Sequence, residues 1–253
     1  MTRLPLAALL LLALQDPVPA PPAGLGLAAF YKKYVDAGGL PIVGSEKVPD
    51  AALVEARTIV LQMTSKRPDA VAAMKELKTR VSLMAKTEVT TDIPEHSDLN
   101  TAFPRTDWNK RCRGVGATVA RPACSATEEN LLQLDGDRYA GESILIHEFG
   151  HTMLVMGMTR IDRGFKADID AAYKDAMAKG LFRNTYAASN ADEYWAEGAQ
   201  DWFDANLTST PSNGIHNEIG TRAALKSYDP ALAALLAKVF GDDAWRWQPK
   251  KRK

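Results

Sequence analysis

Two histidines separated by a single helical turn are the residues best placed to do chemistry. The stretch ILIHEFGHTM contains His147 and His151, and Glu148 directly follows the first of them. Residues i and i+4 of a helix lie on one face, so both imidazoles can reach a single ion, a spacing typical of zinc-binding helices. Glu148 lies about 100° further around the helix, where it can reach a metal-bound water instead. The pattern therefore predicts metal-assisted hydrolysis of an amide bond, with Glu148 as the general base.

A catalytic zinc site usually has three protein ligands, so a third must come from elsewhere in the chain. The metzincin pattern continues with Gly and then His at positions that are Leu154 and Gly157 here, which excludes that class. His96 and His216 stand in no helical or paired setting. We therefore look for a carboxylate ligand downstream.

The segment NTYAASNADEYWAEGAQDWF contains a second pair with the same spacing, Glu193 and Glu197. A helix over this segment, with Asn190 as its N-cap, would place both carboxylates on one face, where they repel each other unless a cation neutralises them. The many aromatic neighbours argue against a solvated acidic face. We predict Glu193 as the third ligand and Glu197 as the acceptor of a hydrogen bond from a ligating histidine.

The two motif-bearing helices are predicted over residues 140–156 and 191–205, within a mainly helical α+β chain with a small mixed sheet. Apolar periodicity, prolines at helix starts and glycine stops predict further helices over residues 50–66, 68–78, 165–180, 218–226 and 230–240, and a short helical patch at 30–35. Alternating patterns predict strands at residues 80–85, 116–122 and 130–137. We expect 116–122 to be an edge strand that holds substrate.

The N-terminus resembles a secretory signal peptide. Arg3 precedes an apolar run over residues 4–14, and small residues follow. This pattern predicts a signal peptide over residues 1–20, with cleavage as late as residue 23 as the alternative. The apolar run is too short to span a membrane, and a retained anchor is the competing interpretation. We expect a secreted or periplasmic protein without membrane association after cleavage.

Export affects how the two cysteines are interpreted. Cys112 and Cys124 are the only cysteines in the chain. In an oxidising compartment the simplest prediction is a disulfide between them, which would stabilise the fold by roughly 3 kcal/mol. Two free buried thiols are the alternative. A cysteine zinc site is disfavoured because the pair lacks the CxxC spacing.

Composition sets the remaining limits. The chain has 253 residues, 46% hydrophobic and 25% charged, an ordinary globular balance. Its 31 basic residues equal its 31 acidic residues, so no overall charge favours nucleic acid. We predict a mainly helical N-terminal region (24–105), a catalytic region (106–248) and a basic tail (249–253).

Taken together, the motifs resemble a known family. The HEFGH helix, Tyr186 and the later EYWAE segment are similar to the gluzincin (HExxH…E) zinc metallopeptidases, above all to the catalytic domain of the anthrax lethal factor group. The stretch leading into the HEFGH helix also resembles a group of secreted, uncharacterised HExxH proteins. The resemblance covers roughly residues 139–204 and implies a zincin-like fold with one Zn²⁺ per chain. It implies His147, His151 and Glu193 as zinc ligands, Glu148 as base, Tyr186 as oxyanion stabiliser and Glu197 as outer acid.

Three functions remain open at this stage. The leading hypothesis is an exported zinc endopeptidase that acts on a peptide or protein through a zinc-bound water activated by Glu148. The second is a zinc amidase acting on cell-wall peptides, and the third is a catalytically silent zinc-binding protein. The presence of both Glu148 and Tyr186 counts against the third. Roles for His216 and Arg222 stay undecided.

Overall fold

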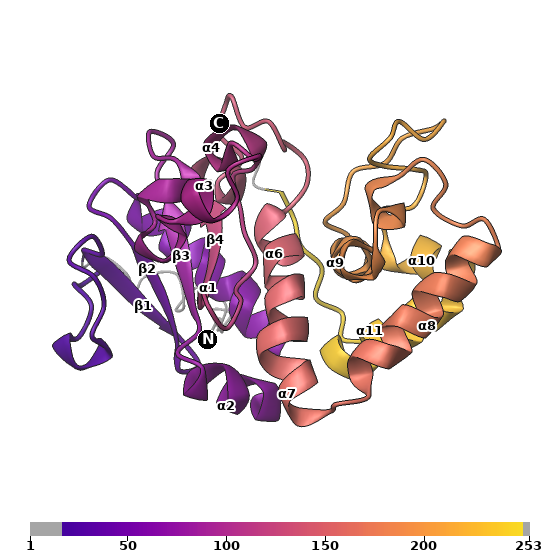
Figure 1. Cartoon of the computed structure of the whole chain (residues 1–253), viewed down its shortest axis with the longest axis horizontal. Helices are drawn as coiled ribbons and strands as arrows, with labels where there is room; N and C mark the ends of the chain where they lie inside the picture. Colours follow the sequence, from indigo (N-terminus) through magenta and orange to yellow (C-terminus); the bar gives the residue numbers. More distant parts are fainter. Residues whose placement is uncertain (1–16, 250–253) are drawn as a thin grey trace, which may run out of the picture.

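The computed structural model describes residues 17–249, with a four-stranded sheet on one side and a group of helices on the other (Figure 1). The strands are β1 (Lys33–Ala37), β2 (Leu40–Gly44), β3 (Arg80–Met84) and β4 (Ala123–Thr127), in spatial order β1-β2-β3-β4. β1 pairs antiparallel with β2, whereas β2, β3 and β4 are parallel. The sheet is therefore mixed, and the chain is a mainly helical α+β protein, as predicted.

The predicted helical patch at residues 30–35 is wrong, because these residues lead into a hairpin. Gly38 and Gly39 both have positive φ, at 67° and 92°, and this tight turn folds β2 back onto β1. Parallel strands need a long crossover, and α1 (Asp50–Thr64) and α2 (Pro68–Glu76) provide it between β2 and β3. Both helices and β3 were predicted.

Two of the three predicted strands are wrong. Residues 116–122 form an irregular segment, because the backbones of Thr118 and Arg121 hydrogen-bond to each other in a turn, and the next residues form β4. Residues 130–137 are not extended either. The chain after β4 enters the short helix α5 (Glu128–Leu131) and then a turn in which Gln133 has a φ of 52°.

The motif-bearing helix begins four residues later than predicted. Ser143 caps α6 (Ile144–Thr152) by accepting a hydrogen bond from the backbone N–H of Ile146. The helix continues as a π-helical turn (Met153–Met158) and as α7 (Thr159–Ile161). The π-helical turn packs against α2, where Gly157 lies close to Ala70.

The C-terminal helices surround α9 (Ala191–Trp202), which lies beside α6 (Figure 1). They are α8 (Phe165–Ala178), α10 (Arg222–Tyr228) and α11 (Pro230–Phe240), and all three were predicted within a few residues. Shorter helical segments lie at Ala23–Leu25, Thr90–Asp92, Pro94–His96, α3 (Leu99–Ala102), α4 (Trp108–Arg111) and Tyr186–Ala188. One cluster of buried apolar side chains extends from Val18 to Trp247 and links sheet and helices.

Parts of the N- and C-terminal predictions lie outside the described residues. Residues 1–16 of the predicted signal peptide and residues 250–253 of the basic tail are among them. Within residues 17–249, no helix combines the length and the apolar character needed to cross a bilayer.

Candidate metal centre

A close contact between α6 and α9 places the two sequence motifs opposite each other. A Cβ atom on Gly150 would lie only 3.2 Å from the Cβ of Ala199, so a larger residue would push the helices apart. The indole Nε1 of Trp195 donates to the carbonyl oxygen of Gly150 at 2.9 Å and fixes the crossing. The sequence meets this requirement with a glycine between the two histidines of the motif.

The crossing brings together all three ligands predicted from the sequence. Glu193 Oε2 lies 3.1 Å from His147 Nε2 and 3.2 Å from His151 Nε2. The two Nε2 atoms are 3.2 Å apart. One ligand atom from each residue falls within 4.8 Å of the others, so this group could bind a metal ion. Two imidazole nitrogens and a carboxylate oxygen are the donor set of many catalytic zinc sites.

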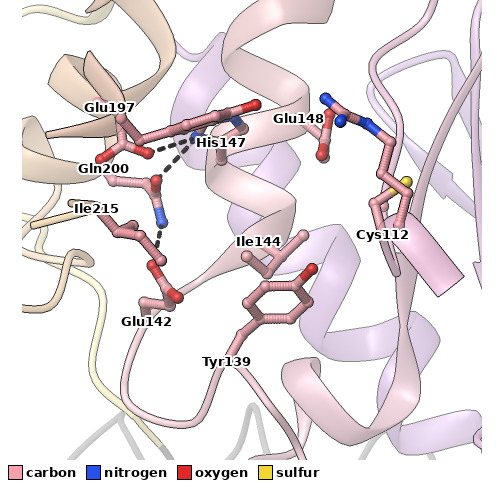
Figure 2. A pocket seen from close by; sticks show the side chains of 12 residues that line it. Cys112, Tyr139, Glu142, Ile144, His147, Glu148, Glu197, Gln200 and Ile215 are labelled. Atoms are coloured by element: carbon pink, nitrogen blue, oxygen red, sulfur yellow. Dashed lines mark hydrogen bonds and ion pairs between the residues drawn. The ribbon is translucent and has the colours of Figure 1, made fainter. Parts of the chain in front are cut away.

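Two side chains from α9 hold the outer nitrogen of His147. Its Nδ1 lies 2.9 Å from Gln200 Oε1 and 3.3 Å from Glu197 Oε1, as the dashed lines in Figure 2 show. A proton on Nδ1 leaves the Nε2 lone pair free to face a metal. Glu197 therefore makes the predicted contact. Gln200 was missed, although its place one turn after Glu197, on the same helix face, was a signal in the sequence.

Contacts within the ligand cluster shift the pKa values of Glu193 and His147 in opposite directions. Burial by itself would raise the pKa of Glu193, but hydrogen bonds with His147 and His151 lower it below its usual range. Burial would lower the pKa of His147, but its contacts with Glu193 and Glu197 raise it. Binding of a metal ion would therefore have to displace a proton from His147.

Glu148 faces a different wall of the site. Its carboxylate accepts a hydrogen bond from the backbone N–H of Gly116, and burial raises its pKa. A Cβ atom on Gly116 would lie 2.8 Å from the Cβ of His151, so this glycine lets the segment lie directly against α6. The backbone N–H of Ala117 donates to Thr152 Oγ1 at 2.9 Å. Residues 116–118 thus form an irregular rim above the helix, at the start of the strand predicted over 116–122.

Tyr186, which the resemblance implies as the oxyanion stabiliser, lies beside the ligands. Its hydroxyl donates to Glu193 Oε1 at 3.0 Å, and its ring stacks on His147 with centroids 6.2 Å apart. Burial and the nearby charge of Glu193 raise its pKa, so the phenol keeps its proton. Tyr186 can therefore act as a hydrogen-bond donor at this position.

The ligands lie in the middle of a groove. A cavity of about 300 Å³ extends on the Ile144 side, and another of about 380 Å³ extends on the Trp108 side. Both are lined by His147, Glu148 and Tyr186. A chain lying in this groove would pass over the ligand cluster, with side chains on both sides of it.

The predicted disulfide is wrong, because both cysteines are free. Cys124 lies in β4 and points into the core, where its thiol contacts the Thr152 hydroxyl. Cys112 lines the groove instead, and burial raises its pKa to about 11. The two thiols thus lie in different places, Cys124 in the core and Cys112 in the wall of the groove.

The other candidate residues lie outside the ligand cluster. His96 is buried, with Nε2 3.0 Å from the carbonyl oxygen of Ala123. Arg222 donates to the carbonyl oxygen of Trp202 at 2.7 Å and pairs with Asp242. His216 lines a small cavity behind Glu197. Among residues 17–249, no second group of three metal-ligating side chains comes as close together.

Comparisons with known proteins give little further constraint. No protein-family model and no curated protein sequence matches the chain. Membership of the gluzincin or lethal factor group therefore stays a prediction. Among solved structures, the chain is similar to the Pro-Pro endopeptidase PPEP-2 from Paenibacillus alvei, at 16% identity and a TM-score of 0.49, over 78% of this chain and 96% of that one. A similarity of this degree supports no statement about activity, which we argue from the site alone.

Proposed function

We propose that the chain is a zinc-dependent endopeptidase that hydrolyses peptide bonds within a peptide or protein substrate. The observation that carries this proposal is the arrangement around Glu193. Two histidines meet its carboxylate within 3.2 Å, and Tyr186 donates to the same group. The general base Glu148 follows His147 directly on α6 and lines both halves of the groove.

Zinc is the metal that best fits this donor set. His147, His151 and Glu193 would hold it through two nitrogens and one oxygen, and three protein ligands leave a position for water or substrate. Bound zinc would supply a more acidic water and a polarised substrate carbonyl. Gln200 and Glu197 would keep the imidazole of His147 in the tautomer and orientation that zinc needs.

The remaining steps belong to side chains of the protein. Glu148 would take the proton from the attacking water and pass it to the leaving amine. The backbone N–H of Gly116 orients the carboxylate of Glu148, and the raised pKa of this carboxylate makes it a stronger base. The hydroxyl of Tyr186 would donate its hydrogen bond to the developing oxyanion instead of to Glu193.

We further propose that the protein acts outside the cytoplasm, in a secreted or periplasmic form. The support is the N-terminal sequence, with its basic residue, apolar run and small residues.

The test is cleavage of a diverse peptide library, read by mass spectrometry, with zinc content measured for each protein. The wild type should cut. Glu148→Gln should cut roughly 10²- to 10⁴-fold more slowly, because the proton acceptor is lost, and should hold equal zinc. Glu76→Gln, which changes an exposed glutamate on α2, is the matched control and should behave as wild type.

Two other outcomes would contradict the proposal. If neither wild type nor Glu148→Gln cuts any peptide while both hold one zinc, the general peptidase function fails, and cell-wall amides become the next substrates to test. If Glu148→Gln cuts as fast as wild type, a different residue acts as the base.

A further inference from the structure

The cavity on the Ile144 side of the ligands has apolar walls and a carboxylate. Tyr139, Ile144 and Ile215 line it, and so does Glu142. Figure 2 shows Glu142 and Tyr139 on the side of the cavity away from His147, with Ile144 between Tyr139 and His147 and with Gln200 between Glu142 and His147. Its volume of about 300 Å³ is enough for one large side chain.

Glu142 lacks a cationic partner although it is deeply buried. It is 7% exposed, and none of the ion pairs formed within residues 17–249 includes it. Its carboxylate accepts one long hydrogen bond, from Gln200 Nε2 at 3.3 Å. Burial and the neighbouring charge of Glu197 raise its pKa to about 7. A buried carboxylate in this condition is costly unless a cation neutralises it.

The other charges that line the cavity leave this end negative. Three carboxylates line it, from Glu142, Glu148 and Glu197, against the guanidinium of Arg111 and the imidazole of His147. The charge of Arg111 lowers the pKa of Cys112, and the charge of His147 lowers that of Glu142. Among residues 17–249, neither Arg111 nor His147 forms an ion pair with Glu142.

A lysine or arginine side chain has the shape and charge that this cavity lacks. Its aliphatic stem can lie against Tyr139, Ile144 and Ile215 while its charged end reaches the carboxylate. A hydrogen bond between two charged groups is about twice as strong as a neutral one. An acidic or a short polar side chain would gain neither contact.

We propose that this cavity is a specificity pocket for a lysine or arginine side chain of the substrate, and that Glu142 selects it. The inference rests on the proposed peptidase function. Because His147 and Glu148 line the same cavity, the selected residue lies next to the scissile bond.

The test compares two peptides that differ at one position, lysine against its uncharged analogue norleucine, placed on each side of the scissile bond in turn. The wild type should cleave the lysine peptide with a kcat/KM about 10- to 100-fold higher at one of the two positions. Glu142→Gln should reduce this ratio to near 1, because only the lysine peptide loses a charged partner.

Asp192→Asn is the matched control, because it removes the same charge from the other half of the groove. Asp192 lines the cavity on the Trp108 side. This variant should keep the wild-type preference for lysine. A wild type that cleaves both peptides equally would overturn the inference and leave the peptidase function standing. A preference that survives in Glu142→Gln would do the same.

A binding measurement separates this inference from catalysis. Nα-acetyl-lysine amide should bind the wild type about 10- to 100-fold more tightly than Nα-acetyl-norleucine amide, as followed by NMR titration. Glu142→Gln should bind both alike. If no peptide is cut, the peptidase function fails and this titration decides the pocket by itself. Equal binding of both amides to the wild type would overturn the inference.

Discussion

Two largely buried glutamates near the α6–α9 interface, Glu193 and Glu142, have pKa values shifted in opposite directions. Glu193 meets the nitrogens of His147 and His151, and these contacts lower its pKa despite burial. Burial and the charge of Glu197 raise the pKa of Glu142 to about 7, although the hydrogen bond from Gln200 and the charge of His147 lower it. The comparison shows that the partner across the interface, more than burial, decides whether a carboxylate here is charged.

Glu197 stands between these two glutamates. One oxygen faces His147 Nδ1, and the other accepts a hydrogen bond from Asn206 Nδ2 at 3.1 Å. The same amide donates to Asp201 Oδ1 at 3.0 Å, and burial and the charge of Glu197 raise the pKa of Asp201. One turn further along α9 than Glu197, Asp201 therefore favours its neutral form more than a free aspartate does.

The largest expected effect is a loss of zinc affinity on substitution of Glu193, whose carboxylate meets both histidines. Glu193→Gln keeps the size of the side chain but removes its charge, so we expect zinc affinity to fall by well over 100-fold, beyond the loss typical of an outer hydrogen-bonding partner. Competition with a chromogenic chelator measures it. Retained wild-type affinity would mean that another residue is the third ligand.

A smaller effect is expected for the second glutamate of the pair. Glu197→Gln leaves all three ligands in place but weakens the hold on His147 Nδ1, so zinc affinity should fall by roughly 10- to 100-fold. The same competition assay compares it directly with Glu193→Gln. Equal losses in the two variants would contradict the division between ligand and outer acid.

The smallest effect concerns stability at the Glu142 end. The unfolded chain ionises this carboxyl near its ordinary pKa of 4.5, whereas the folded chain keeps the proton until about pH 7. The wild type therefore loses stability as the pH rises through this window. After metal removal, Glu142→Gln should be more stable than wild type by about 1–2 kcal/mol at pH 8, with little difference at pH 4.5. Urea unfolding at the two pH values measures this difference. A gain of the same size at both would show that charge is not its cause.

Two predictions failed because they depend on contacts between residues far apart in the sequence: the strand over 116–122 and the disulfide. Residues 116–122 alternate as a strand should, yet contact with α6 through Gly116 and the turn after Thr118 keep them irregular. The disulfide was inferred from the count of cysteines and the expected compartment. Where the two cysteine side chains point depends on tertiary packing, such as that of β4 against α6, and composition carries no information about that packing.

The sequence by itself determined which residues share a helix face. A period of 3.6 residues per turn places His147 with His151 and Glu193 with Glu197 wherever those helices lie. Asn190 caps α9 through contacts within three residues, so it too was predictable. Only the tertiary structure decided that Gln200 joins Glu197 at His147 Nδ1, and that Glu142 lines a pocket beside the ligands. These depend on how far apart and at what angle α6 and α9 cross, which packing between distant residues sets.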